Sequence, residues 1–204
     1  RLSTAGGLNS TGEADDGEVE DYVVGNIFVD DAFNGFSNGQ YIADADTVAA
    51  GNQDAIFGVN AFGTVNAAIA NASIDGLIIV NAGNYSGEAV NISKRLTMQV
   101  QGASTFGSLD DSVTDASLVL NGVTLTIGGN DTNTQFDSVI SGSGSLTKLG
   151  TGNLTLTANE TYTGSTTSSA GTITLQNASN NNIATSTTVL VGTSATLNVS
   201  GLTS

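Results

Sequence analysis

The chain has 204 residues, enough for one domain or for two small ones that share a core. It contains no Cys and no His, which excludes disulfides, zinc-thiolate sites, Cys–His pairs and Ser–His–Asp triads built within the chain. Four basic residues stand against 19 acidic ones, and the net charge of -15 predicts repulsion from nucleic acid and from anionic lipid.

Residues 1–26 form an acidic N-terminal segment, since eight of the acidic residues fall within the first 31 positions. Its polar sequence predicts a loop ending in one short strand at Val19–Val24, too little to bury a core of its own. The stretch GEVEDYVV, with RLSTAGG upstream, resembles the closing part of the GEVEDY domain of large secreted bacterial proteins. This resemblance implies that the rest of that domain lies upstream, so we expect the chain to be a processed product or a fragment.

Residues 27–116 are predicted to form a capping region and the first coils. IFVDD at 27–31 predicts a strand, and the Gly/Asn/Asp-rich residues 32–60 predict a long ordered loop. Residues 61–72 predict the only convincing helix, with Asn60 as its N-cap, because four apolar residues recur at spacings of three and four. This helix could cap one end of the fold. The apolar residues are Phe62, Val65, Ile69 and Ala72.

After the helix the apolar pattern changes to strands at Leu77–Val80, Ala89–Ile92 and Leu96–Val100, with a turn in NAGNYSG. This order resembles the first coils of right-handed parallel β-helices of the pectin-lyase-like fold. In that family a strand ending in a-G-x-Y is followed by a second strand, a basic residue and a third strand ending near Gly. The matching positions here are Ala82, Gly83, Tyr85, Lys94 and Gly102.

Residues 117–204 alternate strand and turn and are predicted to form repeat-type coils. Leu154 and Leu156 alternate with Thr, as do Ile173 and Leu175, so one face enters a core while hydroxyl groups face water. The stretch Gly142–Leu175 resembles the repeat of autotransporter passenger domains, which form parallel β-helical stalks. At roughly 20–25 residues per coil, residues from 75 onward would make about six coils and a rod near 30 Å long. The fold class predicted is therefore all-β, a right-handed parallel β-helix.

Clustered carboxylates suggest one candidate ligand, since Ca²⁺ favours carboxylate and carbonyl oxygens. The best candidates are Asp30, Asp31, Asp44 and Asp46, with Asp15/Asp16 and Asp110/Asp111 as further acidic pairs. The alternative is that these are solvated loop acids, because neither the EF-hand spacing nor a nonapeptide calcium repeat is present. Calcium is thus a candidate ligand, and no cofactor is certain.

Catalysis is the less favoured interpretation of the chemistry. Polysaccharide lyases of the resembled fold use Arg or Lys as base, and here Lys94 and Arg95 occupy a turn between predicted strands. In the later coils Asp131, Asp137 and Glu160 are scattered along the sequence, whereas hydrolases of the fold place several carboxylates on one face. We therefore expect structural basic residues and no enzyme activity. Tyr85 and Tyr162 match motif positions and are expected to pack at coil corners.

The function expected is that of a non-enzymatic structural protein of the cell surface or extracellular matrix. Charged residues make up only 11% of the chain, which favours strands and turns and, with no Cys and scarce Lys, a secreted location. We expect a homo-oligomer or filament built head to tail, with the residues of the predicted N-terminal strand as the connector. The alternatives are a carbohydrate-binding or inactive lyase-like module with a surface polysaccharide as partner, and a monomer whose first 24 residues fold back. The connector residues are Val19, Tyr22, Val23 and Val24.

Overall fold

The computed structural model describes residues 25–177 and 183–202, and its architecture is a parallel β-solenoid of about six turns. The strands lie in two long sheets that face each other, and every strand pair in these sheets is parallel. The all-β parallel solenoid predicted from the sequence is therefore confirmed. Among the described residues, no helix is long and apolar enough to cross a membrane.

The first sheet stacks one short strand from each of the early turns. In chain order its strands are β1 (Ile27–Val29), β4 (Ala61–Phe62), β5 (Leu77–Val80), β7 (Thr97–Val100), β9 (Ser117–Leu120) and β12 (Val139–Gly142).

The second sheet runs through all of the turns and contains the longest strands. These are β6 (Gly83–Ile92), β8 (Ser104–Asp111), β10 (Thr124–Ile127), β11 (Thr134–Phe136), β13 (Ser145–Lys148), β14 (Asn153–Leu156), β15 (Thr166–Leu175) and β16 (Val189–Asn198).

The repeat length follows directly from the strand register. Leu77 pairs with Thr97, which pairs with Ser117, so 20 residues return the chain to the same place one turn further on. Since strand side chains alternate between two faces, this spacing keeps the same face inward in every turn. Apolar residues therefore stack on apolar residues along the whole axis.

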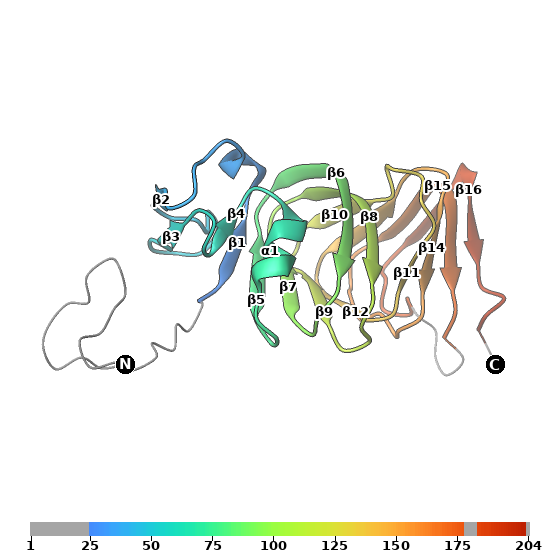
Figure 1. The fold of residues 1–204 in the computed structure, drawn as a ribbon. Helices are drawn as coiled ribbons and strands as arrows, with labels where there is room; N and C mark the ends of the chain where they lie inside the picture. Colours follow the sequence, from blue (N-terminus) through green and yellow to red (C-terminus); the bar gives the residue numbers. More distant parts are fainter. Residues whose placement is uncertain (1–24, 178–182, 203–204) are drawn as a thin grey trace, which may run out of the picture.

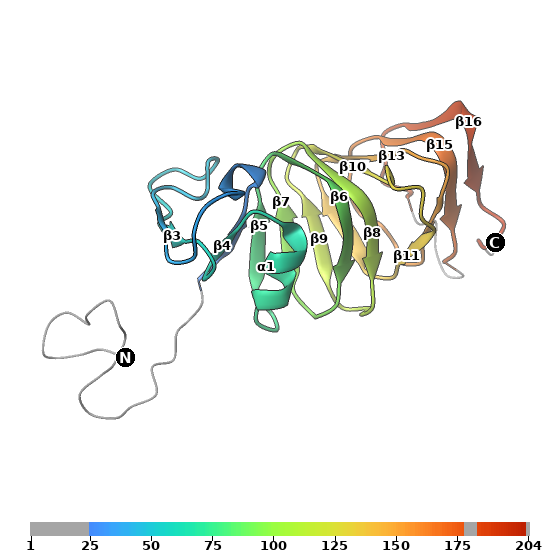
Figure 2. The ribbon, with the colours of Figure 1, turned by 45° about the horizontal axis from the view of Figure 1, so that its top comes forward.

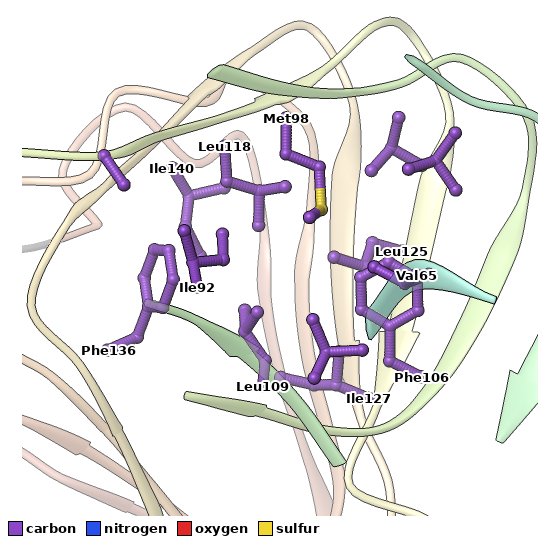
Figure 3. Close-up of a cluster of buried hydrophobic side chains, with 14 of the residues drawn as sticks. Val65, Ile92, Met98, Phe106, Leu109, Leu118, Leu125, Ile127, Phe136 and Ile140 are labelled. Atoms are coloured by element: carbon purple, nitrogen blue, oxygen red, sulfur yellow. The ribbon is translucent and has the colours of Figure 1, made fainter. Parts of the chain in front are cut away.

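The core is one continuous cluster inside the solenoid. Met98, Leu118 and Ile140 stack in register on the first sheet and are fully buried. They face Phe106 and Ile127 of the second sheet across the interior (Figure 3). The cluster includes both Ala116 and Leu118, so the predicted regions 27–116 and 117–204 share one core.

The one α-helix of the described residues, α1 (Val65–Asn71), is shorter than predicted. Thr64, not Asn60, is its N-cap, and the Thr64 hydroxyl accepts a hydrogen bond from the Ala67 backbone N–H. Ala61–Phe62 does not join the helix because it pairs as strand β4 with Phe28 and Val29 of β1. Val65 and Ile69 lie on the buried face of the helix as predicted, whereas the predicted Phe62 lies in β4 and Ala72 is the C-cap.

Residues 32–60 contain more structure than the predicted loop. Here η1 (Asp31–Phe33) precedes an antiparallel pair, β2 (Tyr41–Ile42) and β3 (Ala55–Ile56). A second, smaller apolar cluster lies beneath the pair and includes Phe33, Ile42 and Ala55. We call residues 31–60 the arm; it projects from the N-terminal end of the solenoid, and β16 lies at the opposite end (Figures 1 and 2).

The predicted turn NAGNYSG also differs from the structure, because β6 already begins at Gly83. Gly83, Asn84 and Tyr85 pair with Ser104, Thr105 and Phe106 of β8, and the register shifts between Tyr85 and Ala89. The turn-forming sequence is thus drawn into the sheet by the neighbouring coil, with an irregularity absorbing the mismatch.

Candidate functional site

The N-terminal end of the solenoid is closed by α1. Val65, Ala68 and Ile69 on its inner face are buried in the main core. The helix is also held at both ends. The Glu88 carboxylate accepts hydrogen bonds from the backbone N–H groups of Val65 (3.0 Å) and Asn66 (2.9 Å). These contacts satisfy orphan donors of the first turn and place a negative charge at the positive end of the helix.

Lys94 closes the other end of the helix. Its Nζ donates hydrogen bonds to the carbonyl oxygens of Ala70 (2.9 Å) and Ala72 (2.8 Å), a common way to satisfy the last helical carbonyls. Its neighbour Arg95 forms an exposed ion pair with Asp75, and the hydrogen bond from Arg95 lowers the pKa of that carboxyl. Both basic residues are therefore engaged in structural contacts, as the sequence analysis expected.

The four predicted calcium ligands lie in or beside the arm. Asp30 caps η1, since its Oδ1 accepts from the Ala32 N–H (2.9 Å), and its Oδ2 accepts from Asn81 Nδ2 (3.2 Å). Asp31 Oδ2 accepts from the Asn84 N–H (3.0 Å). These bonds connect the start of the arm to the first coil.

Asp46 is the only buried member of the four. Its Oδ1 accepts hydrogen bonds from the N–H groups of Val48 and Ala49 and from Gln101 Nε2 (2.8 Å). Burial raises the pKa of Asp46, but these hydrogen bonds outweigh burial and lower it. Asp44 is exposed. Within residues 25–177 and 183–202 no three acidic side chains gather into a group that could hold a metal ion, and calcium binding stays a prediction.

Three acidic residues, Asp111, Asp137 and Glu160, lie near one corner of the solenoid, although Asp137 and Glu160 are far apart in the sequence and were expected to be scattered. Asp111 accepts hydrogen bonds from the N–H groups of Asp137 (2.7 Å) and Ser138 (2.9 Å) in the next turn. Glu160 Oε2 accepts from the Ile140 N–H (2.6 Å). Asp111 and Glu160 are buried, so this corner offers no open carboxylate pair to a substrate. Asp131 lies apart and accepts from the Thr151 N–H.

Lys148 is buried within the core, which the sequence analysis did not predict. Lys148 pairs with Ile127 in the preceding turn and with Ser168 in the following turn, and all three residues are buried. Its Nζ donates to the carbonyl oxygens of Leu149 and Gly150, and burial lowers the pKa of the ammonium group. Tyr85 and Tyr162 are buried packing residues, as expected.

Large exposed apolar side chains gather at the two ends of the molecule. Of the eleven in the part of the chain that the structure describes, eight lie either on the arm or on the last turn. The arm contributes Tyr41, Val48, Ile56 and Val59, and the last turn contributes Val189, Leu190, Val191 and Val199. These exposed apolar side chains thus lie toward opposite ends of the rod, because the arm and β16 lie at opposite ends (Figure 1).

Among the described residues, β16 pairs only with β15. Val189 and Val191 of β16 stack in register on Thr166 and Ser168 of β15. Thr166 and Ser168 are at most 1% exposed, whereas Val189 and Val191 are 41% and 47% exposed, since no described residue stacks on them. No charged residue occurs after Glu160 in the sequence, so this end also lacks the charges that usually protect an edge strand.

The arm carries a small hollow of about 240 Å³ beside its exposed apolar residues. Its lining residues are Tyr41, Asp54, Ala55, Ile56 and Asn60. The hydrogen bond between the Tyr41 hydroxyl and the Asp54 carboxylate raises the pKa of Tyr41. The predicted connector residues Val19, Tyr22, Val23 and Val24 lie outside the described residues.

Comparisons with protein-family models, with curated proteins and with solved structures find no match for this chain. The resemblances to pectin-lyase-like proteins, autotransporter repeats and the GEVEDY domain therefore rest on the sequence motifs. The parallel solenoid itself rests on the strand register.

Proposed function

We propose that this chain is an extracellular structural subunit that assembles end to end into a β-solenoid fibre or stalk. The observation that carries the proposal is the distribution of exposed apolar side chains, eight of which lie at the two ends of the described rod. Contiguous exposed apolar surface commonly marks a surface that binds another protein.

The two ends differ in a way that favours head-to-tail contact. The N-terminal end is closed by α1 and carries acidic residues, including Asp44 and Asp54 of the arm. The last described strand, β16, carries no charged residue, and no described residue stacks on its outer edge. Contact between unlike ends does not close on itself and therefore generates a filament. It also avoids bringing two acidic ends together.

The basic residues of the described chain support a structural role over a lyase-like one. Lys94 caps α1, Arg95 pairs with Asp75, and Lys148 is buried inside the core. None of the three lies free on a lateral face beside carboxylate and aromatic side chains, the arrangement that an enzymatic or sugar-binding groove needs.

Sedimentation velocity at rising protein concentration, with electron microscopy of the same samples, tests the proposal. We expect larger species at higher concentration and rods whose width stays constant while their length grows. Val191→Asp, which places a charge on the exposed face of β16, should shift the distribution to monomer. The matched control is Leu149→Asp, because Leu149 is 36% exposed in the turn between β13 and β14, outside the arm and the last turn. A wild-type protein that stays monomeric throughout would overturn the proposal.

A further inference from the structure

We propose that the junction between the arm and the first coil is a Ca²⁺ site whose ligands are the Asp30 carboxylate, the Ala45 carbonyl oxygen and the Asn81 side-chain oxygen. The proposal is independent of end-to-end assembly. It keeps one of the four acidic residues that the sequence predicted as calcium ligands, and it adds two neutral oxygens that the sequence did not indicate. The bound ion fixes the arm to the solenoid.

Two oxygen atoms already converge on the side-chain amide of Asn81. Asn81 Nδ2 donates hydrogen bonds to Asp30 Oδ2 (3.2 Å) and to the Ala45 carbonyl oxygen (2.9 Å). Oxygens that bind one Ca²⁺ at about 2.3–2.6 Å lie roughly 3 Å from each other. The end of the Asn81 side chain therefore lies as far from both oxygens as one calcium ligand lies from the next.

The same amide carries an oxygen that has nothing to bind. Asn81 is 1% exposed, and among the described residues its Oδ1 has no hydrogen-bond partner. A buried acceptor without a partner is costly, so it points to a group that the chain does not supply. A half-rotation about the Cβ–Cγ bond exchanges Oδ1 and Nδ2 without changing the shape of the side chain. Three oxygens then meet at the junction, and a cation is needed to hold them together.

The junction carries negative charge without a basic partner. Burial raises the pKa of the Tyr85 hydroxyl, and the charges of Asp30, Asp31 and Glu88 raise it further, which places all three carboxylates near this side chain. The basic side chains of the described chain have other partners, so a divalent cation supplies the missing positive charge. These basic residues are Lys94, Arg95 and Lys148.

Other hydrogen bonds hold the ligands in place. Asp30 Oδ1 caps η1 by accepting from the Ala32 N–H, and this leaves Oδ2 toward Asn81. The Asn81 backbone N–H donates to the Val29 carbonyl oxygen, and the Asn81 carbonyl oxygen accepts from Ser104 Oγ. Ligands that are already fixed lose less conformational freedom when the ion binds.

The ligand set predicts weak binding that suits an extracellular protein. Asp46 Oδ1 is occupied by two backbone N–H groups and Gln101, and Asp44 is exposed, so one carboxylate and two neutral oxygens remain. Asp30 is partly exposed, which gives the ion and its coordinating waters access. With this low ligand charge we expect a Kd of about 10⁻⁴–10⁻³ M.

Calorimetric titration of the full chain with CaCl₂ tests the proposal. The wild type should bind with the Kd given above, and about 10 mM Ca²⁺ should raise Tm by roughly 3–10 °C. Asp30→Asn keeps an oxygen that can cap η1 but removes the ligand charge, so it should weaken binding by about tenfold or more. Asn81→Asp presents an oxygen in either orientation, so it should tighten binding by about tenfold and lower Tm without calcium.

Hydrogen exchange measured by mass spectrometry locates the ion, because Ca²⁺ should slow exchange in residues 31–60 of the wild type but not of Asp30→Asn. The matched control is Asp115→Asn, an exposed carboxyl between β8 and β9, which should bind like the wild type.

Four results would overturn the site. They are a wild type without calcium binding, unchanged affinity in Asp30→Asn, affinity in Asn81→Asp no higher than in the wild type, and loss of binding on deleting residues 1–24, which would place the ion on that segment. None of them bears on assembly, which sedimentation velocity tests separately.

Discussion

Glu160 should make the stability of this protein fall as pH rises. Its carboxyl is 1% exposed, and Oε2 accepts a hydrogen bond from the Ile140 N–H (2.6 Å). Among the described residues, Oε1 has no hydrogen-bond partner. Burial raises the pKa of Glu160 from 4.5 to about 8; the Ile140 hydrogen bond opposes this rise, and the charge of Asp111 adds to it.

The sign and size of the effect follow from proton binding. Between pH 4.5 and about 8 the folded state holds a proton that the unfolded state has released. The contribution of Glu160 to stability is therefore complete below pH 4.5 and is lost as pH rises through about 8. At roughly 1.36 kcal/mol per pH unit, the loss amounts to about 5 kcal/mol.

Glu160→Gln isolates this contribution. The glutamine keeps an oxygen that accepts from the Ile140 N–H, but it carries no charge at any pH. We expect the variant to gain on the wild type by several kcal/mol between about pH 5 and about pH 9. Urea unfolding followed by circular dichroism at both pH values measures the two free energies of unfolding. Asp115→Asn, which changes an exposed carboxyl, is the matched control and should follow the wild type.

The comparison between variants is the decisive quantity, because other groups also titrate in this range. A difference between Glu160→Gln and wild type that stays constant from acid to alkaline pH would refute the reasoning. So would a wild type that gains stability relative to the variant as pH rises.

Two further substitutions test the packing of the solenoid by urea unfolding. Leu118→Ala should cost about 2–5 kcal/mol because Leu118 is fully buried in the stacked core, whereas Ile74→Ala at an exposed site should cost less than about 0.5 kcal/mol. Equal losses would contradict a continuous core at Leu118. Gly142→Ala should destabilise the fold by more than about 1 kcal/mol, since Gly142 has φ +97 and a Cβ there would lie 2.3 Å from a backbone oxygen of the preceding turn. Gly129→Ala, where a Cβ meets nothing within 4 Å, is its control, and a tolerated Gly142→Ala would argue against the turn geometry.

The sequence alone was enough to predict the solenoid and its repeat. Strict alternation of apolar and hydroxyl residues, as in Leu154 and Leu156, indicates strands with one buried face. Turn residues at regular intervals then limit each coil to roughly 20–25 residues, and the strand register between Leu77, Thr97 and Ser117 gives 20. Both signals are local, so they can be read without knowing which strands pair. The inner face of α1 was predictable for the same reason.

Only the tertiary structure decided the features that depend on pairing between distant residues. Ala61–Phe62 continues a helical pattern, but it becomes a strand because β1, more than 30 positions earlier, offers a parallel partner. The residues paired with Lys148 in the neighbouring turns, Ile127 and Ser168, are buried, so the strand register also buries Lys148 despite its charge. Glu160 and Asp111 are 49 positions apart, yet they share one corner because two coils bring them back to the same place. The alternation along one strand carries no information about which residues the next turn will place beside it, and that placement decides burial, pKa and the two exposed ends.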